Sequence, residues 1–488
     1  MDVAVDELIA DIPLTAWAIG TTTRRLTGNP SAAERFYRDA TATAPHDPIA
    51  QNNLGLLREL QGRHDDAIAH YRRALALDPV LATARRNLAL LLVRIGHGRD
   101  AQPLLHQEIE ESPDGTRWLH DVISTAMKER DLRFAGELAS VLAMLRWGSA
   151  RYPRDRFVPV PALPPRAFVS VAKLRHDIEQ LEYLRPRLGG EVDPIIASYQ
   201  RVLERFAARG GDGRFELDDE TREEIGDTYN RILHVRPTPR VRDVFSPRWN
   251  PRAVESDYLA STLGLVVVDD LLSPEALREV RQFCLESTVW SGIRYAHGRI
   301  GAFFYDGFNC PLLLQIAERL RADLPNLIGA HALRQLWGFK NTEPLPADST
   351  NHADFAAVSV NLWITPDDAN LDPARGGLVV YDVDAPPSWD FERYNGRSDR
   401  IRRFLVDKGA RSLTIPYRQN RAIIFNSDLF HATDAVTFKA GYENRRINIT
   451  MLYGERDADD HHPNLVGEQP DELASAWRSQ AFMRLRSR

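Results

Sequence analysis

The second half of the chain contains short segments in which apolar and polar residues alternate. The alternation is clearest over residues 358–364 and 446–451. In the second segment, Arg446, Asn448 and Thr450 form one set, and Ile447, Ile449 and Met451 form the other. A period of two predicts β-strands with two unlike faces, because successive side chains of a strand point to opposite sides. We expect the polar face of the last strand to line a cavity.

The first third of the chain shows a longer period. Ala33, Ala67, Ala101 and Ala135 recur every 34 residues. The same interval separates Pro45, Pro79 and Pro113, then Tyr37, Tyr71 and Leu105, and finally Leu54 and Leu88. This constant phase of small, large and proline positions resembles the tetratricopeptide repeat, in which paired helices stack. Gly55 and Ala67 are then expected to let the paired helices approach, while Tyr71 fills the groove between them.

A proline-rich linker is predicted over residues 152–165, and helical apolar spacing follows at 173–181 and 194–203. We interpret the neighbours His176 and Asp177 as part of a solvated helix face and assign them no role. Residues 382–411 combine aromatic residues with arginines: Trp389, Phe391, Tyr394, Arg397, Arg400, Arg402 and Arg403. Two interpretations stay open for them, a lid that grips an anionic or peptide substrate and a surface loop with a short amphipathic helix.

Composition narrows the class of protein. The chain has 488 residues, of which 43% are apolar and 27% charged, and this is typical of a globular protein of two or three domains. A net charge of −6 does not favour nucleic acid or an acidic membrane as a partner. The two cysteines, Cys284 and Cys310, are expected to be buried thiols. The first residues lack the features of a signal peptide, and no apolar run reaches the length of a membrane span, so we expect a cytoplasmic protein.

Candidate metal ligands lie in the alternating part of the chain. His352 and Asp354 are two residues apart before a predicted strand, so in an extended segment they project to the same side. His431 follows a predicted strand at 421–425. Two imidazoles and one carboxylate occupy one face of an Fe(II) ion and leave its other positions open. The pattern His-x-Asp is weak evidence by itself, because it also occurs at residues 64–66, within the repeats.

Residues of about 261–453 resemble the Fe(II)/2-oxoglutarate-dependent dioxygenases, and within them the prolyl-hydroxylase-like group. The likeness rests on segments in the right order: a strand at 265–272 leading into a helix capped by Ser273 with Pro274 at its first position, the pair His352 and Asp354, the turn at Gly376 and Gly377, the return strand at 413–416 before His431, and the strand that begins at Arg446. The resemblance implies a double-stranded β-helix, a jelly-roll of two facing sheets.

The resemblance also implies a set of cofactors. Fe(II) would be held by His352, Asp354 and His431, which are thereby the catalytic residues, with O2 as the oxidant. The co-substrate 2-oxoglutarate would place its far carboxylate on Arg446, helped by Asn448 and Thr450.

The choice of arginine depends on the register of the last strand. Arg446 lies 15 positions after His431, a long interval for this family, and Arg445 adjoins it. Arg446 is preferred because it begins the polar face. A shift by one residue would give the role to Arg445.

We therefore predict an α+β multidomain protein. Its parts are tetratricopeptide-like repeats over 1–150, a linker and helical connecting region over 151–257, the double-stranded β-helix domain over 258–458, and a helical tail over 459–488. The predicted activity is hydroxylation of a side chain of a polypeptide or carrier-bound substrate that the repeats recruit. Two alternatives stay open: a hydroxylase of an amino acid or natural-product intermediate, and a repeat scaffold with an inactive oxygenase fold.

Overall fold

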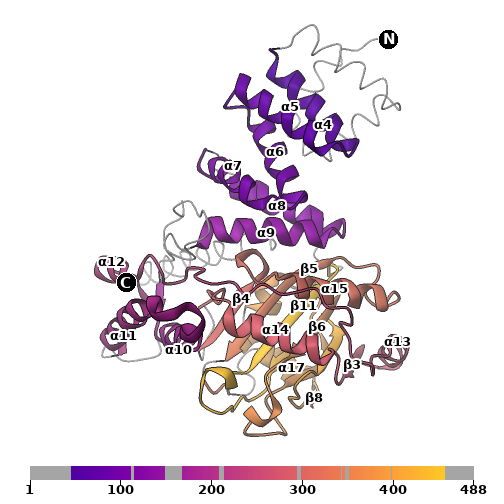
Figure 1. The fold of residues 1–488 in the computed structure, drawn as a ribbon. Coiled ribbons are helices and arrows are strands. Elements are labelled where there is room, and N and C mark those ends of the chain that lie inside the picture. Colours follow the sequence, from indigo (N-terminus) through magenta and orange to yellow (C-terminus); the bar gives the residue numbers. More distant parts are fainter. Residues whose placement is uncertain are drawn as a thin grey trace, which may run out of the picture. The chain divides into compact units, whose positions relative to one another are not determined.

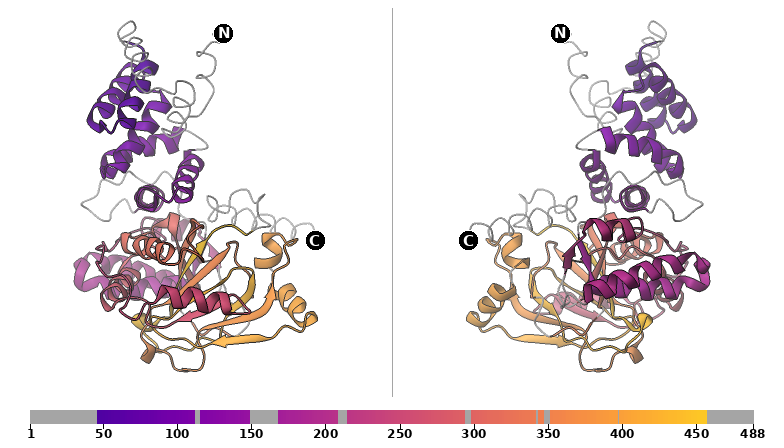
Figure 2. Two further views of the ribbon diagram at one scale, coloured as in Figure 1. Left: turned by 90° about the vertical axis from the view of Figure 1, so that its right-hand side faces the viewer. Right: turned by 90° about the vertical axis from the view of Figure 1, so that its left-hand side faces the viewer.

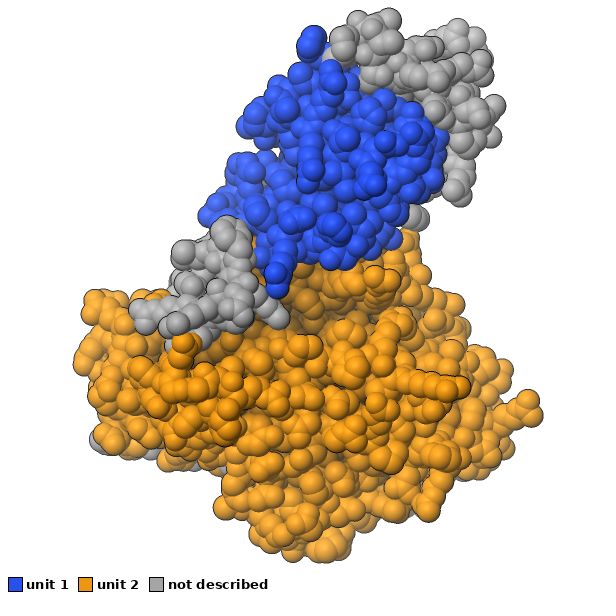
Figure 3. Space-filling model, viewed as in Figure 1, with its two compact units in different colours: residues 1–122 blue, residues 123–488 orange. Residues whose placement is uncertain are grey.

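The computed structural model describes residues 46–111, 115–148, 168–207, 214–293, 298–341, 343–346, 351–396 and 398–456. The predicted proline-rich linker and C-terminal tail lie outside these residues, as do Ala33, Tyr37, Pro45 and Pro113. The chain divides into two compact units, Met1–Val122 and Ile123–Arg488 (Figure 3). The domain boundaries at 150, 257 and 458 stay predictions.

The first unit is built from helices that pack in sequence order. They are α4 (Pro48–Leu60), α5 (His64–Leu77), α6 (Ala82–Arg94) and α7 (Gly98–Glu111) (Figure 1). The beginning of α8 (Gly115–Lys128) also belongs to this unit. Ala67, Tyr71 and Ala101 are fully buried. A Cβ on Gly55 would come 2.7 Å from the Tyr71 ring, so glycine is required for α4 and α5 to approach this closely. These contacts confirm the predicted repeat and the role of its small residues.

Most helices of the second unit come before the central strands of its sheets, although β3 and β4 lie among them in the chain order. They are α9 (Leu132–Trp147), α10 (Val171–Leu188), α11 (Asp193–Ala207), α12 (Asp219–Ile225), α13 (Pro251–Ala260), α14 (Pro274–Glu286) and α15 (Pro311–Asp323), with a small ribbon of β1 (Phe168–Ser170) and β2 (Arg214–Glu216). Among the described helices, none combines the length and the apolar character needed to cross a bilayer.

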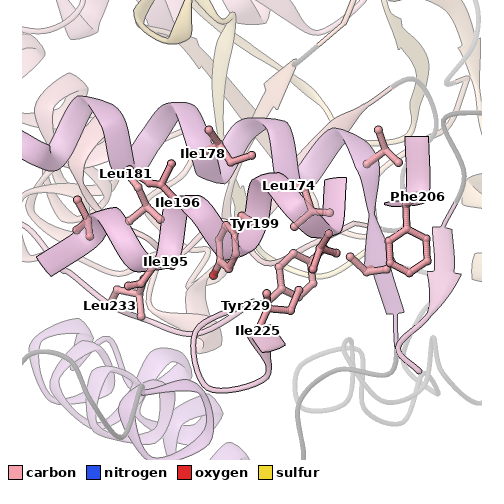
Figure 4. Close-up of a cluster of buried hydrophobic side chains, with 14 of the residues drawn as sticks. Leu174, Ile178, Leu181, Ile195, Ile196, Tyr199, Phe206, Ile225, Tyr229 and Leu233 are labelled. Carbon is pink, nitrogen blue, oxygen red and sulfur yellow. The ribbon is translucent and has the colours of Figure 1, made fainter. Parts of the chain in front are cut away.

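Two sequence predictions for these helices are confirmed. Helices α10 and α11 occupy the segments with helical spacing and share an apolar core, in which Leu174, Leu181, Ile196 and Tyr199 lie between the helices (Figure 4). The Ser273 hydroxyl accepts the Ala276 N–H at the start of α14. Both buried thiols are also found as expected.

Two antiparallel sheets complete the second unit. The six-stranded sheet has the order β3 (Leu265–Val268), β9 (Ala422–Asn426), β6 (Val358–Trp363), β11 (Ile447–Tyr453), β5 (Leu333–Asn341) and β4 (Arg299–Phe303). The three-stranded sheet has the order β10 (Leu429–Thr433), β7 (Leu378–Asp384) and β8 (Ser412–Ile415). Trp363, Val380, Ile415 and Phe425 meet in one apolar cluster between the sheets. This is the predicted jelly-roll arrangement, and in the described residues the two sheets do not close into a barrel.

The strand register defines an inner and an outer face of the six-stranded sheet, because directly opposite residues of antiparallel strands point the same way. The inner face, toward the three-stranded sheet, carries Arg299, Phe303, Trp337, Phe339, Asn341, Asn361, Trp363, Asn448 and Thr450. The outer face carries Lys340, Ile447, Ile449 and Met451, all of them buried. Helices α10, α14 and α15 lie on this outer side (Figure 2).

His176 and Asp177 lie in this outer contact, so their predicted position on a solvated helix face is wrong. Both side chains are buried, because α10 is covered by α11 on one side and by the sheet on another. His176 Nδ1 is 2.9 Å from Asp177 Oδ1, and His176 Nε2 is 3.4 Å from Lys340 Nζ. Lys340 also donates to the Tyr442 hydroxyl at 2.7 Å, and Lys173 pairs with Asp177.

The buried imidazole predicts acid sensitivity. Burial, followed by the nearby Lys340, lowers the pKa of His176 well below its ordinary value of 6.5. Below that value the unfolded chain binds more protons than the folded chain, so the free energy of unfolding falls as the pH falls. We expect His176→Gln to remove part of this fall, as measured by urea unfolding at about pH 7.5 and about pH 5.5. The exposed His97→Gln is the control, and an equal fall in all three proteins would contradict the prediction.

Candidate metal centre

Three side chains with ligand atoms meet at one edge of the sheets. His352 and His431, the central residue of β10, form two backbone hydrogen bonds with each other, of 3.0 and 2.8 Å. The Asp354 N–H donates to Ser427 O at 3.0 Å. Ligand atoms of His352, Asp354 and His431 all lie within 4.8 Å of one another. The structure therefore brings together the three residues that we predicted as metal ligands.

The two imidazoles face the Asp354 carboxylate. His352 Nε2 is 3.7 Å from Asp354 Oδ1, and His431 Nε2 is 3.6 Å from Asp354 Oδ2. These distances are too long for good hydrogen bonds. Each nitrogen faces a different oxygen of the same carboxylate. Such spacing suits groups that bind a common ion better than groups that bind each other.

Neighbouring groups orient the two most buried ligands. His431 Nδ1 is 2.9 Å from Leu429 O, and an N–H there leaves the Nε2 lone pair for a metal. The Ser359 hydroxyl donates to Asp354 Oδ2 at 2.7 Å and lies 2.8 Å from Ser427 Oγ. The His352 side chain is 24% exposed, against 3% for Asp354. The cluster is therefore reached by solvent from the His352 side.

The donor set fits Fe(II), because two neutral imidazoles and one carboxylate on one face leave open positions for further ligands. The other His-x-Asp sequence differs in its surroundings. His64 and Asp66 lie at the start of α5, where Asp66 binds Arg63. Within the described part of the chain, the group around Asp354 is the one that brings three potential ligands together.

Arg446 enters the interior at the start of β11 and is 3% exposed. Its guanidinium donates to Gly376 O at 2.6 Å and to Gly377 O at 3.3 Å, and it lies over the rings of Trp363 and Tyr417. No described carboxylate forms an ion pair with it. Burial lowers the pKa of Arg446 to about 10. A buried cation whose partners are carbonyls and rings favours the binding of an anion.

Arg445 lies on the other side of the strand. Its guanidinium forms an ion pair with Glu179 of α10, with Nη2 at 2.6 Å from Oε2. Arg446 is therefore the arginine that points into the interior. Its role as the anchor of a co-substrate stays a prediction.

The inner face also places Asn448 and Thr450 near Arg446. The Thr450 hydroxyl donates to Asn361 Oδ1 at 2.6 Å and accepts from Asn448 Nδ2 at 3.0 Å. The Asn448 Oδ1 atom has no partner among the described residues. Thr450 has thus already donated its hydroxyl hydrogen to Asn361, so it has none left for a carboxylate, and its expected contact with a co-substrate is less direct than that of Arg446.

Sequence reasoning missed Asn341. Its backbone N–H donates to Arg446 O at 3.0 Å, and its side chain is 5% exposed. Neither atom of its amide has a hydrogen-bond partner among the described residues. Leaving a buried amide unsatisfied costs about 1–3 kcal/mol, so Asn341 is a further candidate for contact with a ligand. No local pattern marks it, because its neighbours belong to other strands.

Comparison with known proteins first supports the repeats. A family model of the tetratricopeptide repeat matches residues 24–82. A comparison with curated protein sequences gives no match. The N-terminal part of the chain therefore carries tetratricopeptide repeats, in agreement with the period and the packing described above.

Solved structures similar to the chain include two proteins of nogalamycin biosynthesis, the α-ketoglutarate-dependent carbocyclase SnoK and the epimerase SnoN, and HygX from Streptomyces hygroscopicus with nickel and 2-oxoglutarate bound. SnoK is 12% identical, with 48% of this chain and 94% of that chain covered and a TM-score of 0.33. SnoN is 14% identical, with 42% of this chain and 80% of that chain covered and a TM-score of 0.31. HygX is 15% identical, with 42% of this chain and 87% of that chain covered and a TM-score of 0.28. Scores this low carry no conclusion about activity.

We expect a divalent cation to stabilise the folded protein through the cluster. An ion at 100 times its Kd that binds only the folded state raises the free energy of unfolding by about 2.7 kcal/mol. Asp354→Ala should abolish this gain, whereas Asp66→Ala, in the other His-x-Asp sequence, should keep it. Anaerobic thermal unfolding with and without Mn(II) measures the effect. Equal stabilisation of both variants would place the ion elsewhere.

Proposed function

We propose that the chain is an Fe(II)- and 2-oxoglutarate-dependent oxygenase. One observation carries the proposal: two imidazoles and a carboxylate meet at the interior that also encloses Arg446, a buried arginine without a described carboxylate partner. His352, Asp354 and His431 would hold Fe(II), and Arg446 would bind the far carboxylate of 2-oxoglutarate. The metal suits the donor set, and the dicarboxylate suits the buried cation.

The surroundings of Arg446 favour a strong ion pair. Trp363 and Tyr417 cover its guanidinium, and both rings are buried. Water is thereby kept from the pair, and an ion pair is stronger where the local dielectric constant is low. The backbone carbonyls of Gly376 and Gly377 hold the guanidinium in place before a ligand arrives. Preorganisation of this kind reduces the entropy that binding costs.

The ligand set contributes orientation and charge. Asp354 supplies one negative charge to the cluster, and Ser359 fixes one of its oxygens. His431 offers Nε2 because its other ring nitrogen lies against Leu429 O. When bound, Fe(II) with 2-oxoglutarate and O2 supplies the oxidising power for hydroxylation of a substrate C–H bond. The chain's own residues position the reactants and limit access of water.

Anaerobic titration of the metal-free protein with Fe(II) and 2-oxoglutarate tests the cofactor site. We expect a visible charge-transfer band in the wild type and none in Asp354→Ala. Arg446→Ala should weaken the affinity for 2-oxoglutarate by about 100-fold, because loss of one partner of a buried charge pair costs roughly 2–5 kcal/mol. Arg445→Ala is the matched control, since Arg445 pairs with Glu179 on the outer face.

The two arginine variants separate the possible outcomes. A loss of 2-oxoglutarate affinity in Arg445→Ala, with normal affinity in Arg446→Ala, would show that Arg445 is the anchor and would contradict the assignment to Arg446. Absence of the band in folded wild-type protein would remove the oxygenase proposal and leave the repeats as the functional part.

We further propose that the substrate is a polypeptide or carrier-bound side chain recruited by the repeats. The support is the tetratricopeptide match, since such repeats commonly bind polypeptide segments on their extended surface. A hydroxylase of a free amino acid or natural-product intermediate is the alternative, in which the repeats would dock or dimerise the protein. A second alternative is an inactive oxygenase fold that serves as a scaffold.

Turnover of 2-oxoglutarate to succinate distinguishes these substrate classes. If the repeats recruit the substrate, polypeptide fractions should accelerate succinate release by the full-length protein, and a short peptide that contains the hydroxylated residue should show a higher KM at similar kcat. Acceleration by free amino acids or small metabolites, with no effect of polypeptides, would favour the small-molecule alternative. No acceleration by either class, despite a normal charge-transfer band, would favour the scaffold.

A further inference from the structure

The segment predicted as a lid or surface loop contacts the backbone between two of the candidate ligands. It contains helices α16 (Phe391–Asn395) and α17 (Ser398–Asp407). The Ala353 N–H donates to Tyr394 O at 2.9 Å, and Asn395 Nδ2 donates to Ala353 O at 2.9 Å. Ala353 stands between the two ligands His352 and Asp354. Both backbone polar groups of the residue between two ligands are therefore held by α16.

An apolar core extends this contact to the third ligand. Phe355 and Phe430 pack in one buried cluster with Tyr394, Ile401 and Leu405. Phe355 follows the first two ligands, and Phe430 immediately precedes the second histidine. The cluster thus joins helices α16 and α17 to both ligand-bearing segments.

Further contacts fix the beginning of this segment. The Ala385 N–H donates to Asp428 O at 2.7 Å. The Arg456 guanidinium binds the Asp428 carboxylate and the Ala385 carbonyl, and it lies over the Tyr394 ring. The side chains of Arg402 and Arg403 on α17 are exposed. These contacts describe a packed support and do not favour a lid that closes on an anion.

We propose that Asn395 is a positioning residue for the metal ligands, acting through Ala353. A rotation of the peptide groups around Ala353 would turn the flanking side chains away from a common ion, because His352 and Asp354 meet only while the segment between them stays extended. Groups that orient ligands commonly change metal affinity by about 10–100-fold when they are removed. The inference rests on the proposed metal site and concerns how the orientation of its ligands is maintained.

The test uses the full-length protein and anaerobic titration with Co(II), whose visible spectrum reports coordination. Asn395→Asp keeps the size of the side chain but replaces the donor with an acceptor that faces Ala353 O. We expect Co(II) affinity to fall by about 10-fold or more, with an altered spectrum. Asn444→Asp is the matched control, because Asn444 Nδ2 donates to Ala440 O at 2.7 Å away from the ligands.

Three outcomes are informative. Weaker Co(II) binding in Asn395→Asp, with normal binding in the control and a thermal midpoint of the metal-free protein close to wild type, supports positioning. Normal Co(II) affinity and spectrum in Asn395→Asp overturn the inference, whatever its thermal midpoint, and a lower midpoint would then assign Asn395 a purely structural role. No Co(II) binding by wild type would overturn the metal site itself.

A second variant, Asn395→Ala, lacks the repulsive carboxylate. A loss of Co(II) affinity in this variant too would attribute the effect to the missing hydrogen-bond donor.

Discussion

The candidate site depends above all on one pair of backbone hydrogen bonds, those between His352 and His431. The two residues are distant in sequence, and the pair brings both imidazoles to the same Asp354 carboxylate. His352 precedes β6 of the six-stranded sheet, whereas His431 belongs to β10 of the three-stranded sheet. The ligand cluster therefore forms only when the two sheets face each other. Packing of the two sheets and assembly of the candidate ligand cluster are therefore coupled.

Two buried basic residues, Lys340 and Arg446, have different surroundings because they lie on opposite faces of the six-stranded sheet. Lys340 of β5 points outward, where the rings of Trp290 and Tyr442 surround its ammonium group and burial lowers its pKa. Arg446 points inward, into the space between the two sheets. A shift of β11 by one residue would exchange Arg446 and Arg445. The ion pair between Arg445 and Glu179 of α10 opposes such a shift, so the connecting helices help to define the interior of the sheets.

Local periodicity was sufficient to predict the repeats, helices α10 and α11, and the strands around the candidate ligands. The 34-residue period predicts the repeats because each repeat contacts mainly its neighbours, so the residues that pack recur at regular intervals in the sequence. Periodicity failed where burial depends on distant segments. His176 occupies a polar position of a helix that is covered on two sides, and Asn341 becomes conspicuous only beside Arg446 of another strand. The contact of Asn395 with Ala353 likewise joins segments whose proximity no local pattern encodes.

The two faces of the six-stranded sheet differ in exposure. In β4, in β5 from Gln335 onward and in β11, every partly exposed residue lies on the inner face, and the outer-face residues are buried beneath helices. The partly exposed residues are Arg299, Phe303, Trp337, Phe339 and Asn448. The edge near β7 and β10 is instead covered by α16 and α17 through their apolar cluster. Trp337 of β5 joins the two regions, because its ring packs against Phe355 of this cluster while the residue stays partly exposed on the inner face.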